Sequence, residues 1–227
     1  MYINDLRYSL QKSIASHFAD DTSITFSSSK LKTLETILNT DLKGISDWLK
    51  ANRLSLNVDK SKLLIFQSKQ RKLDLNCLSI KIEGSKLKPC DNVKYLGLFL
   101  DKSLSWDFHV NQLSKKLSRA NGILAKIRHF LPTKILISVY YSIFYSHILY
   151  GCSVWSLTTK LNIDLITVLQ KKCLRIINFT PFNSHTNELF DKNQLLKLDD
   201  IIKIDQLKLV FDFKNKKLPK ISKRYFN

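Results

Sequence analysis

An unbroken helical stripe in the second half of the chain places the strongest constraint on its fold. Apolar residues recur there in steps of three and four, at Val110, Leu113, Leu117, Ala120, Leu124, Ile127 and Leu131. That spacing keeps one apolar face along a helix. Earlier segments carry short alternating or compact apolar runs, which are typical of strands. The sequence therefore predicts an α+β protein with hairpins in its first part and only helices in its second.

Residues 1–106 are predicted to hold the strands and one helix. Apolar residues recur at helical spacing from Leu31 to Leu49, after a run of three serines suited to capping a helix. Residues 67–73 are polar and basic, and we expect an exposed loop there. Strands are predicted at 13–17 and 22–26, at 63–66, on either side of the Glu83-Gly84 turn, and at 92–100.

The remaining chain is predicted to be helical. Pro132 is expected to open a second helix after the stripe, because proline is tolerated at the first helical position. Further helices are expected from about 161 to 179 and from about 199 to 213, followed by a basic, frayed end at 214–224. We place one group of helices at 107–158 and a C-terminal helical region at 159–227.

The uncharged segment from Ile135 to Trp155 allows a membrane interpretation. It contains no Asp, Glu, Lys or Arg over 21 residues, which is long enough to cross a bilayer. It also contains four serines, a histidine and five Tyr or Trp residues. We therefore predict a buried helix and no membrane partner, and a membrane-associated basic protein stays the alternative of lowest rank.

Basic residues outnumber acidic ones by a wide margin. The chain has 37 Lys and Arg against 19 Asp and Glu, for a formal charge of +18. Such a surface attracts polyanions; nucleic acid is the commonest candidate and an anionic membrane the rival. No acidic residue lies between Asp107 and Asp164, a gap of 56 residues. Mixed charges would serve solubility equally well, so this gap favours a track for phosphates.

Basic side chains flank the apolar stripe of the helix that begins near Val110. A solvated helix face would look the same, and this interpretation stays open. If the helix binds nucleic acid, the contacting residues are Lys115, Lys116, Arg119, Lys126 and Arg128.

The four cysteines indicate a reducing compartment. Cys77, Cys90, Cys152 and Cys173 are widely spaced and form no C-x-x-C pair, which argues against a zinc ribbon and a disulfide framework. The first residues are polar where a secretory signal would be apolar. We expect a cytoplasmic or nuclear protein that is not secreted.

Two adjacent carboxylates, Asp20 and Asp21, lie between the first two predicted strands in the sequence Phe18-Ala19-Asp20-Asp21. At the tip of a hairpin they would be open to solvent. Carboxylate oxygens suit Mg²⁺ bound together with substrate phosphates, as in two-metal displacement at phosphorus. Ordinary turn chemistry also favours Asp at such positions, and for these two residues taken alone it is the better interpretation.

The order of motifs along the chain resembles a reverse transcriptase of the non-long-terminal-repeat, jockey-like retrotransposon class. The Phe18-Ala19-Asp20-Asp21 segment resembles the catalytic hairpin of the palm, and the segment 57–61 (Asn-Val-Asp-Lys-Ser) resembles the next palm motif. The segment 94–101 with Trp106 and His109 resembles the primer-gripping hairpin and the entry to the thumb. Tyr150-Gly151-Cys152 and 169–175 resemble the thumb and the helical region beyond it.

The resemblance implies roles for individual residues. Asp20 and Asp21 would bind Mg²⁺, and Lys60 would neutralise or protonate the leaving pyrophosphate. Leu96, Gly97 and Leu98 would support the primer backbone, with Gly97 allowing a close approach. The basic helix would follow the template–primer duplex. The implied partners are an RNA template, a DNA primer and deoxynucleoside triphosphates; the oligomeric state is left open.

The resemblance also implies what the chain lacks. In this family the fingers and an earlier palm strand with another metal-binding Asp precede the region that Met1 begins. We therefore expect a partial palm at 1–106 whose two-metal site is not completed in cis, and a truncated chain that is inactive as an RNA-directed DNA polymerase. The alternative is a basic nucleic-acid-binding module without catalysis.

Overall fold

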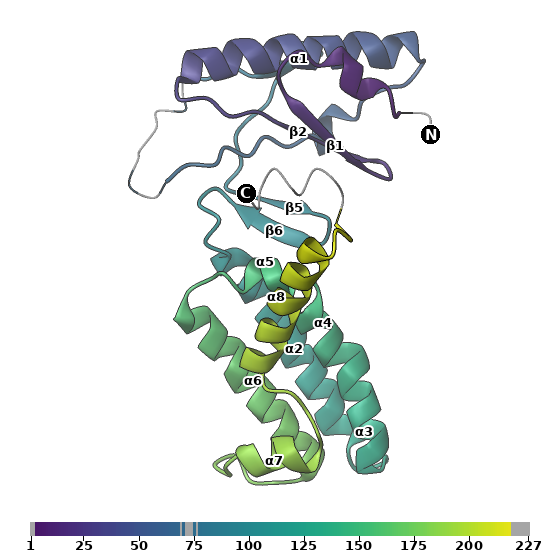
Figure 1. Cartoon of the computed structure of the whole chain (residues 1–227), viewed down its shortest axis with the longest axis vertical. Helices are drawn as coiled ribbons and strands as arrows, with labels where there is room; N and C mark the ends of the chain where they lie inside the picture. The colour runs from purple at the N-terminus through teal and green to yellow at the C-terminus, as the bar shows by residue number, and fades with distance from the viewer. Residues whose placement is uncertain (1–2, 69, 71–74, 76, 219–227) are drawn as a thin grey trace. The chain divides into compact units, whose positions relative to one another are not determined.

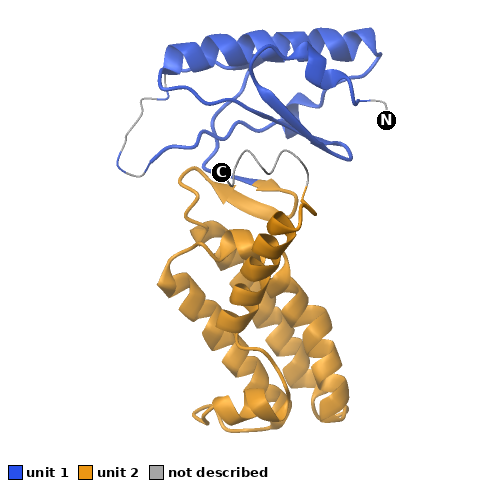
Figure 2. Cartoon of the chain, viewed as in Figure 1, with its two compact units in different colours: residues 1–93 blue, residues 94–227 orange. Residues whose placement is uncertain are grey.

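The computed structural model of the chain describes residues 3–68, 70, 75 and 77–218. It divides into two compact units, residues 1–93 and 94–227, which Figure 2 shows in different colours. The described residues form three two-stranded hairpins and a larger number of helices, with most helices in the second unit (Figure 1). The predicted mixture of hairpins and helices is thus confirmed.

The first hairpin and the long helix α1 form most of the first unit. After a 3₁₀ turn at Leu6–Ser9, strand β1 (Ile14–Phe18) pairs antiparallel with β2 (Asp21–Thr25). Helix α1 (Leu31–Ala51) follows the predicted periodicity and buries Leu42 and Ile45. Its N-cap residue is Lys30, without a side-chain cap, so the expected serine cap is not formed; the Ser28 hydroxyl instead accepts a hydrogen bond from the Lys30 N–H at 3.2 Å.

Helix α1 also supplies hydrogen bonds to the segment before the second hairpin, which consists of β3 (Lys81–Ile82) and β4 (Ser85–Lys86). The Asn39 side chain donates to the Ser79 carbonyl at 2.8 Å and accepts from the Lys81 N–H at 2.8 Å. Glu35 accepts from the Ser79 N–H at 3.1 Å. These side chains replace a neighbouring strand, since backbone groups in a packed segment need partners.

The prediction of a strand at 63–66 is wrong. The structure gives only an isolated bridge between Leu63 and Pro89, while Ile65 is buried in the core beneath α1. A short apolar run indicates that a segment is buried, but a buried segment need not pair with a strand. Residues 69 and 71–73 of the predicted loop lie outside the described residues, as does the predicted basic end beyond residue 218.

The helical unit follows a third hairpin, β5 (Asn92–Tyr95) and β6 (Leu98–Asp101), where a single strand was predicted. The turn at Leu96 and Gly97 divides the predicted strand in two, because both residues have positive φ angles. The predicted helices are present as α2 (Asp107–Ile127), α3 (Thr133–Tyr140), α6 (Lys160–Asn178) and α8 (Leu198–Lys214); α7 (Asn187–Lys192) was not predicted.

The uncharged segment 135–155 buries only one side, with Tyr140 and Phe144 inside and Tyr141 and Tyr150 exposed, and it is not the single buried helix that was predicted. Helix α3 passes through a π-helical turn (Tyr141–Tyr145) into α4 (Ser146–Leu149), and α5 (Cys152–Trp155) follows a turn at Gly151. On its outer side, the hydroxyls of Ser138, Ser142 and Ser146 each donate to the carbonyl four residues earlier. Within the described residues, no helix combines the length and apolar character needed to span a membrane.

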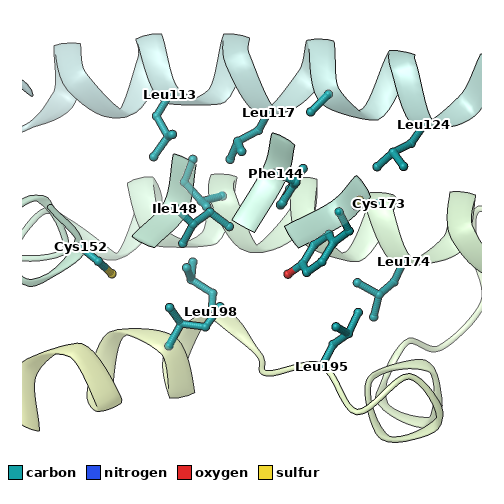
Figure 3. Packing of buried hydrophobic residues seen from close by; sticks show 14 of the residues in the cluster. Leu113, Leu117, Leu124, Phe144, Ile148, Cys152, Cys173, Leu174, Leu195 and Leu198 are labelled. Carbon is teal, nitrogen blue, oxygen red and sulfur yellow. The ribbon is translucent and has the colours of Figure 1, made fainter. Parts of the chain in front are cut away.

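The core of the helical unit lies between α2, the 136–155 segment and α6. Leu117 and Leu124 of α2, Phe144 and Ile148 are fully buried, and Figure 3 shows them packed with Cys173, Leu174, Leu195 and Leu198. Gln170 is a polar side chain that is fully buried in this core. Gln170 donates to the Tyr140 hydroxyl and the Leu196 carbonyl, both at 2.9 Å, and accepts from the Leu198 N–H at 3.0 Å. Its hydrogen bonds therefore fix the start of α8.

Candidate nucleic-acid interface

The Asp20-Asp21 pair lies at the tip of the first hairpin, as predicted. Asp21 is the first residue of β2 and is paired with Phe18, so only Ala19 and Asp20 form the turn. Ala19 has a φ of 52°, a conformation that residues other than glycine seldom adopt. Both carboxylates are exposed, and the Phe18 side chain beside them is 64% exposed.

The donor chemistry of this hairpin suits a magnesium ion only in part. Asp20 and Asp21 supply carboxylate oxygens, which Mg²⁺ accepts when substrate phosphates and water complete its shell. The described residues contain no group of three or more His, Cys, Asp or Glu side chains placed to hold a metal ion. The hairpin therefore offers two carboxylate ligands to an ion whose other ligands would be phosphates and water, and it does not form a complete metal site.

A buried aspartate on α1 holds the start of this hairpin. Asp41 has no exposed surface and accepts hydrogen bonds from the N–H groups of Gln11 at 2.8 Å, Lys12 at 3.4 Å and Ser13 at 2.8 Å. Burial alone would raise the pKa of Asp41, but the hydrogen bonds from Ser13, Gln11 and Lys12 outweigh it and lower the pKa below its ordinary value of 3.8.

The motif analysis missed Asp41, although the sequence held a signal. Asp41 lies on the apolar stripe of α1, three residues after Leu38 and four before Ile45. A carboxylate at such a position must find buried donors, because an unpaired buried charge is strongly unfavourable. Asp41 acts as a positioning residue for β1.

Lys60 lies in a turn of its own, at the end of a 3₁₀ segment (Val58–Lys60). Its backbone N–H donates to the Asn57 side-chain oxygen at 3.1 Å, and its side chain is exposed. This local bond explains the conformation of the motif without any ligand. The assignment of Lys60 to the Asp20-Asp21 site stays a prediction.

The segment Leu96-Gly97-Leu98 forms the tip of the third hairpin, which packs against the helical unit. The Tyr150 hydroxyl donates a hydrogen bond to the Leu96 carbonyl. A Cβ atom on Gly97 would come within 3.0 Å of the Tyr150 ring, and one on Gly151 within 3.0 Å of the Leu98 methyl groups. In this structure the group that lies close to Gly97 is the Tyr150 ring. Contact with a primer stays a prediction.

The turn between β6 and α2 is built around the Asp101 carboxylate. It accepts hydrogen bonds from the N–H groups of Ser103 at 3.0 Å, Ser105 at 3.0 Å and Trp106 at 2.9 Å. Burial opposes the ionised form, yet these bonds together lower the pKa of Asp101. With its lone pairs used in this way, Asp101 orders the entry to α2.

His109, in the first turns of α2, is buried and neutral. Its Nδ1 accepts a hydrogen bond from the Phe99 N–H at 3.3 Å, and its ring lies among Phe99, Trp106 and Trp155. Burial and, to a smaller extent, the charge of Lys116 lower its pKa from 6.5 to about 4.

A small hollow of about 60 Å³ with both polar and apolar lining lies between the third hairpin, α2 and α4. Its polar lining consists of His109, Gln112, Lys116, His147 and Tyr150. Pockets for drug-sized ligands measure roughly 300–1,000 Å³, so this hollow is far too small for a nucleotide. It has the size of a site for ordered water, which fills about 30 Å³ per molecule.

The predicted basic residues of α2 do not share one face. At 100° per residue, Lys115, Arg119 and Lys126 lie within about 40° of one another, and all three side chains are exposed. Lys116 is turned toward the hollow. Arg128 lies on another side, where its guanidinium donates to the Ile176 carbonyl of α6 at 3.5 Å. Three of the five residues thus form a basic face on α2, which we call the α2 basic face.

Sequence comparison relates the chain to one class of proteins, the RNA-directed DNA polymerases of mobile elements. The chain is 24% identical over 187 residues to the "RNA-directed DNA polymerase from mobile element jockey" of Drosophila melanogaster, covering 81% of this chain and 20% of that protein. It is 26% identical over 190 residues to the jockey polymerase of Drosophila funebris, covering 82% and 20%. A probable polymerase from transposon BS of Drosophila melanogaster is 26% identical over 178 residues, covering 76% and 19%.

These similarities confirm the predicted resemblance to jockey-like, non-long-terminal-repeat retrotransposon polymerases. The chain spans about a fifth of the length of these curated relatives. Neither a protein-family model nor a solved structure matches the chain.

Proposed function

We propose that this chain is a segment of a retrotransposon RNA-directed DNA polymerase that binds an RNA template paired with a DNA primer through the α2 basic face. Residues 1–106 then correspond to part of the palm, 107–158 to the thumb and 159–227 to a helical region beyond it. Sequence similarity to the jockey polymerases supports the class, and the surface of α2 supports the contact.

The observation that carries this proposal is the alignment of Lys115, Arg119 and Lys126 on one exposed face. From Lys115 to Lys126 the helix rises by about 16 Å, which follows the backbone of a duplex over several nucleotides. The face lies in the 56-residue stretch between Asp107 and Asp164 that lacks acidic residues. Phosphates therefore meet no repulsive charge from this stretch, and release of counterions from the duplex drives binding.

Asp20 and Asp21 are the residues that would hold Mg²⁺ with the triphosphate of an incoming nucleotide. The ion would stabilise the negative charge that develops during phosphoryl transfer. Since the described residues place no third ligand with this pair, we expect the chain by itself to bind a template–primer duplex and not to extend it.

The test of duplex binding uses two variants with equal loss of charge. The first replaces Lys115, Arg119 and Lys126 by Gln; the second replaces the exposed α8 residues Lys203, Lys208 and Lys214 by Gln. Fluorescence anisotropy with an RNA–DNA duplex is measured from 50 to 200 mM salt. We expect the first variant to lose affinity at least tenfold and to show a salt slope smaller by about 2.7, at roughly 0.9 for each of the three lost phosphate contacts. Equal behaviour of the two variants would refute the α2 basic face.

The second candidate function is nucleic-acid binding without catalysis, which the incomplete ligand set favours. The test is primer extension on an RNA template with Mg²⁺, beside Asp20→Ala. Extension that disappears in the variant would mean that another chain, or a second copy, completes the site. In the binding-only case, Asp20→Ala and Asp21→Ala should leave duplex affinity unchanged or improve it, because they remove negative charge.

A further inference from the structure

Exposed aromatic rings gather where α2 ends and where the chain leaves α6, at the α7 end of the helical unit (Figure 1). Phe130 is 83% exposed and Phe182 is 78% exposed. Phe179, in the left-handed conformation at the C-cap of α6, is 50% exposed. Three exposed phenyl rings at one end of a helix pair are unusual enough to indicate a contact surface.

Two arginines interleave with these rings. The guanidinium of Arg128 lies over Phe179 at 4.8 Å from the ring centroid, and that of Arg175 lies over Phe182 at 5.7 Å. Hydrogen bonds to the backbone also hold both arginines in place. Arg128 donates to the Ile176 carbonyl at 3.5 Å, and Arg175 donates to the Ser184 carbonyl at 3.0 Å.

His129, which directly precedes Phe130 in the chain, has its ring 5.4 Å from that of Phe179 between centroids, in an edge-on arrangement. Phe179 and Phe182 thus each contact an arginine, while all three phenyl rings keep half or more of their surface exposed. We call Arg128, Phe130, Arg175, Phe179 and Phe182 the aromatic–arginine patch.

The charge of the segments that carry the patch residues indicates the class of ligand, although the neighbouring helix α7 adds Glu188 and Asp191 beside Lys192. Asp164 is the only acidic residue between Asp107 and Glu188, so the segments that build the patch contain Lys, Arg and His but no Asp or Glu. A ligand that combines flat aromatic rings with negative charge satisfies both parts of the patch. Unpaired nucleotides have this combination, since every base can stack on an aromatic ring and every phosphate can meet an arginine. In a duplex the bases are already stacked and their faces are not free.

We propose that the aromatic–arginine patch binds a single strand of nucleic acid, with bases stacked on Phe130 and Phe182 and phosphates contacted by Arg128 and Arg175. The site is distinct from the α2 basic face, which meets the backbone of a duplex. The inference rests on the proposed function only in taking nucleic acid as the partner class.

The experiment compares a strand that has bases with one that does not. Anisotropy is measured with a twelve-nucleotide deoxythymidine strand and with an abasic strand of the same length and charge. The variant carries Phe130→Ala and Phe182→Ala, and the control carries Leu207→Ala and Phe211→Ala on the exposed side of α8. Because stacking on an aromatic side chain is worth roughly tenfold or more per base, the first variant should bind the thymidine strand at least tenfold more weakly and the abasic strand equally well.

Other outcomes overturn the inference. Equal affinities of variant and wild type for the thymidine strand would mean that no base stacks there. Equal weakening on both strands would mean that the rings act through the backbone or the fold, and circular dichroism separates these two causes. A fall in self-association of the variant in sedimentation, with unchanged strand binding, would assign the patch to a second copy of the chain. Duplex affinity is measured in parallel. If the variant loses base stacking but still binds the duplex, the result bears on the patch alone and does not contradict the proposed function.

Discussion

The Tyr150 hydroxyl donates a hydrogen bond to the Leu96 carbonyl, and the same tyrosine ring lies where a side chain on Gly97 would be. A hairpin tip and a turn between two short helices, more than fifty residues apart in the chain, are thereby held together. The segment with the most specific family resemblance is thus also the segment by which the third hairpin joins the helices.

Gly97→Ala is expected to destabilise the chain for two separable reasons. The φ of 81° costs a residue with a Cβ atom about 1–2 kcal/mol, and the new methyl group would lie 3.0 Å from the Tyr150 ring. In urea unfolding, Tyr150→Ala in the Gly97→Ala background should relieve the second part only. A coupling energy of zero between the two substitutions would contradict the packing of Tyr150 on Gly97.

Asp41→Asn is expected to loosen the start of β1. The Asn side chain has one acceptor oxygen, and its NH₂ group would face the backbone N–H donors. Part of the set of three hydrogen bonds is therefore lost, which should lower the free energy of unfolding by about 1–3 kcal/mol. Asp47→Asn, at an exposed position of the same helix, is the control. Amide hydrogen exchange at Gln11 and Ser13 should rise in the first variant and not in the second. Unchanged exchange would contradict the positioning role of Asp41.

Acid is expected to destabilise the helical unit through His109. Its folded pKa of about 4 lies below the ordinary value of 6.5. Between these values the unfolded chain binds a proton that the folded chain does not, so stability falls as the pH falls from 6.5 to 4 and is unaffected by this group above 6.5. At about 1.4 kcal/mol per pKa unit, the whole contribution is roughly 3 kcal/mol.

His109→Gln should flatten the dependence of unfolding free energy on pH in that window. The slope left in the variant includes the smaller effect of exposed His147, whose pKa is lowered by burial and by Lys116. The lowered pKa values of Asp41 and Asp101 act in a separate window, since their stabilisation is lost only as the pH falls below 3.8. An unaltered slope between pH 4 and 6.5 in the variant would show that His109 is not the group responsible.

Two helical glycines should respond in opposite ways to alanine. A Cβ atom on Gly44 would lie 2.5 Å from the Ser9 carbonyl oxygen, so Gly44→Ala forces α1 away from the preceding turn and should cost about 1–3 kcal/mol. Gly122 on α2 has no atom within 4 Å of such a Cβ, so Gly122→Ala should stabilise by about 0.5–1 kcal/mol. Thermal unfolding of both variants checks the pair; the same sign for both would refute this account of the two helices.

Local patterns predicted those parts of the fold that one segment decides alone. The steps of three and four from Val110 and from Leu31 correspond to α2 and α1, and the polar turn at Asp20 corresponds to the first hairpin. The segment 63–66 was mistaken for a strand because an apolar run has the same appearance in either environment. The segment 135–155 was expected as one helix, but a π-helical turn at Tyr141–Tyr145 and a turn at Gly151 divide it.

The sequence by itself determined the order of hairpins and helices, the basic surface and the relation to the jockey polymerases, because periodicity, charge and motif order are properties of neighbouring residues. Only the tertiary structure shows that Asp41 holds the start of β1 and that the Tyr150 ring lies beside Gly97. It alone also shows that Arg128 lies outside the α2 basic face, over the Phe179 ring. Each of these contacts joins residues roughly 30 to 54 positions apart. Such pairs are chosen by the competition of buried groups for partners across the whole fold, and no local pattern records that competition.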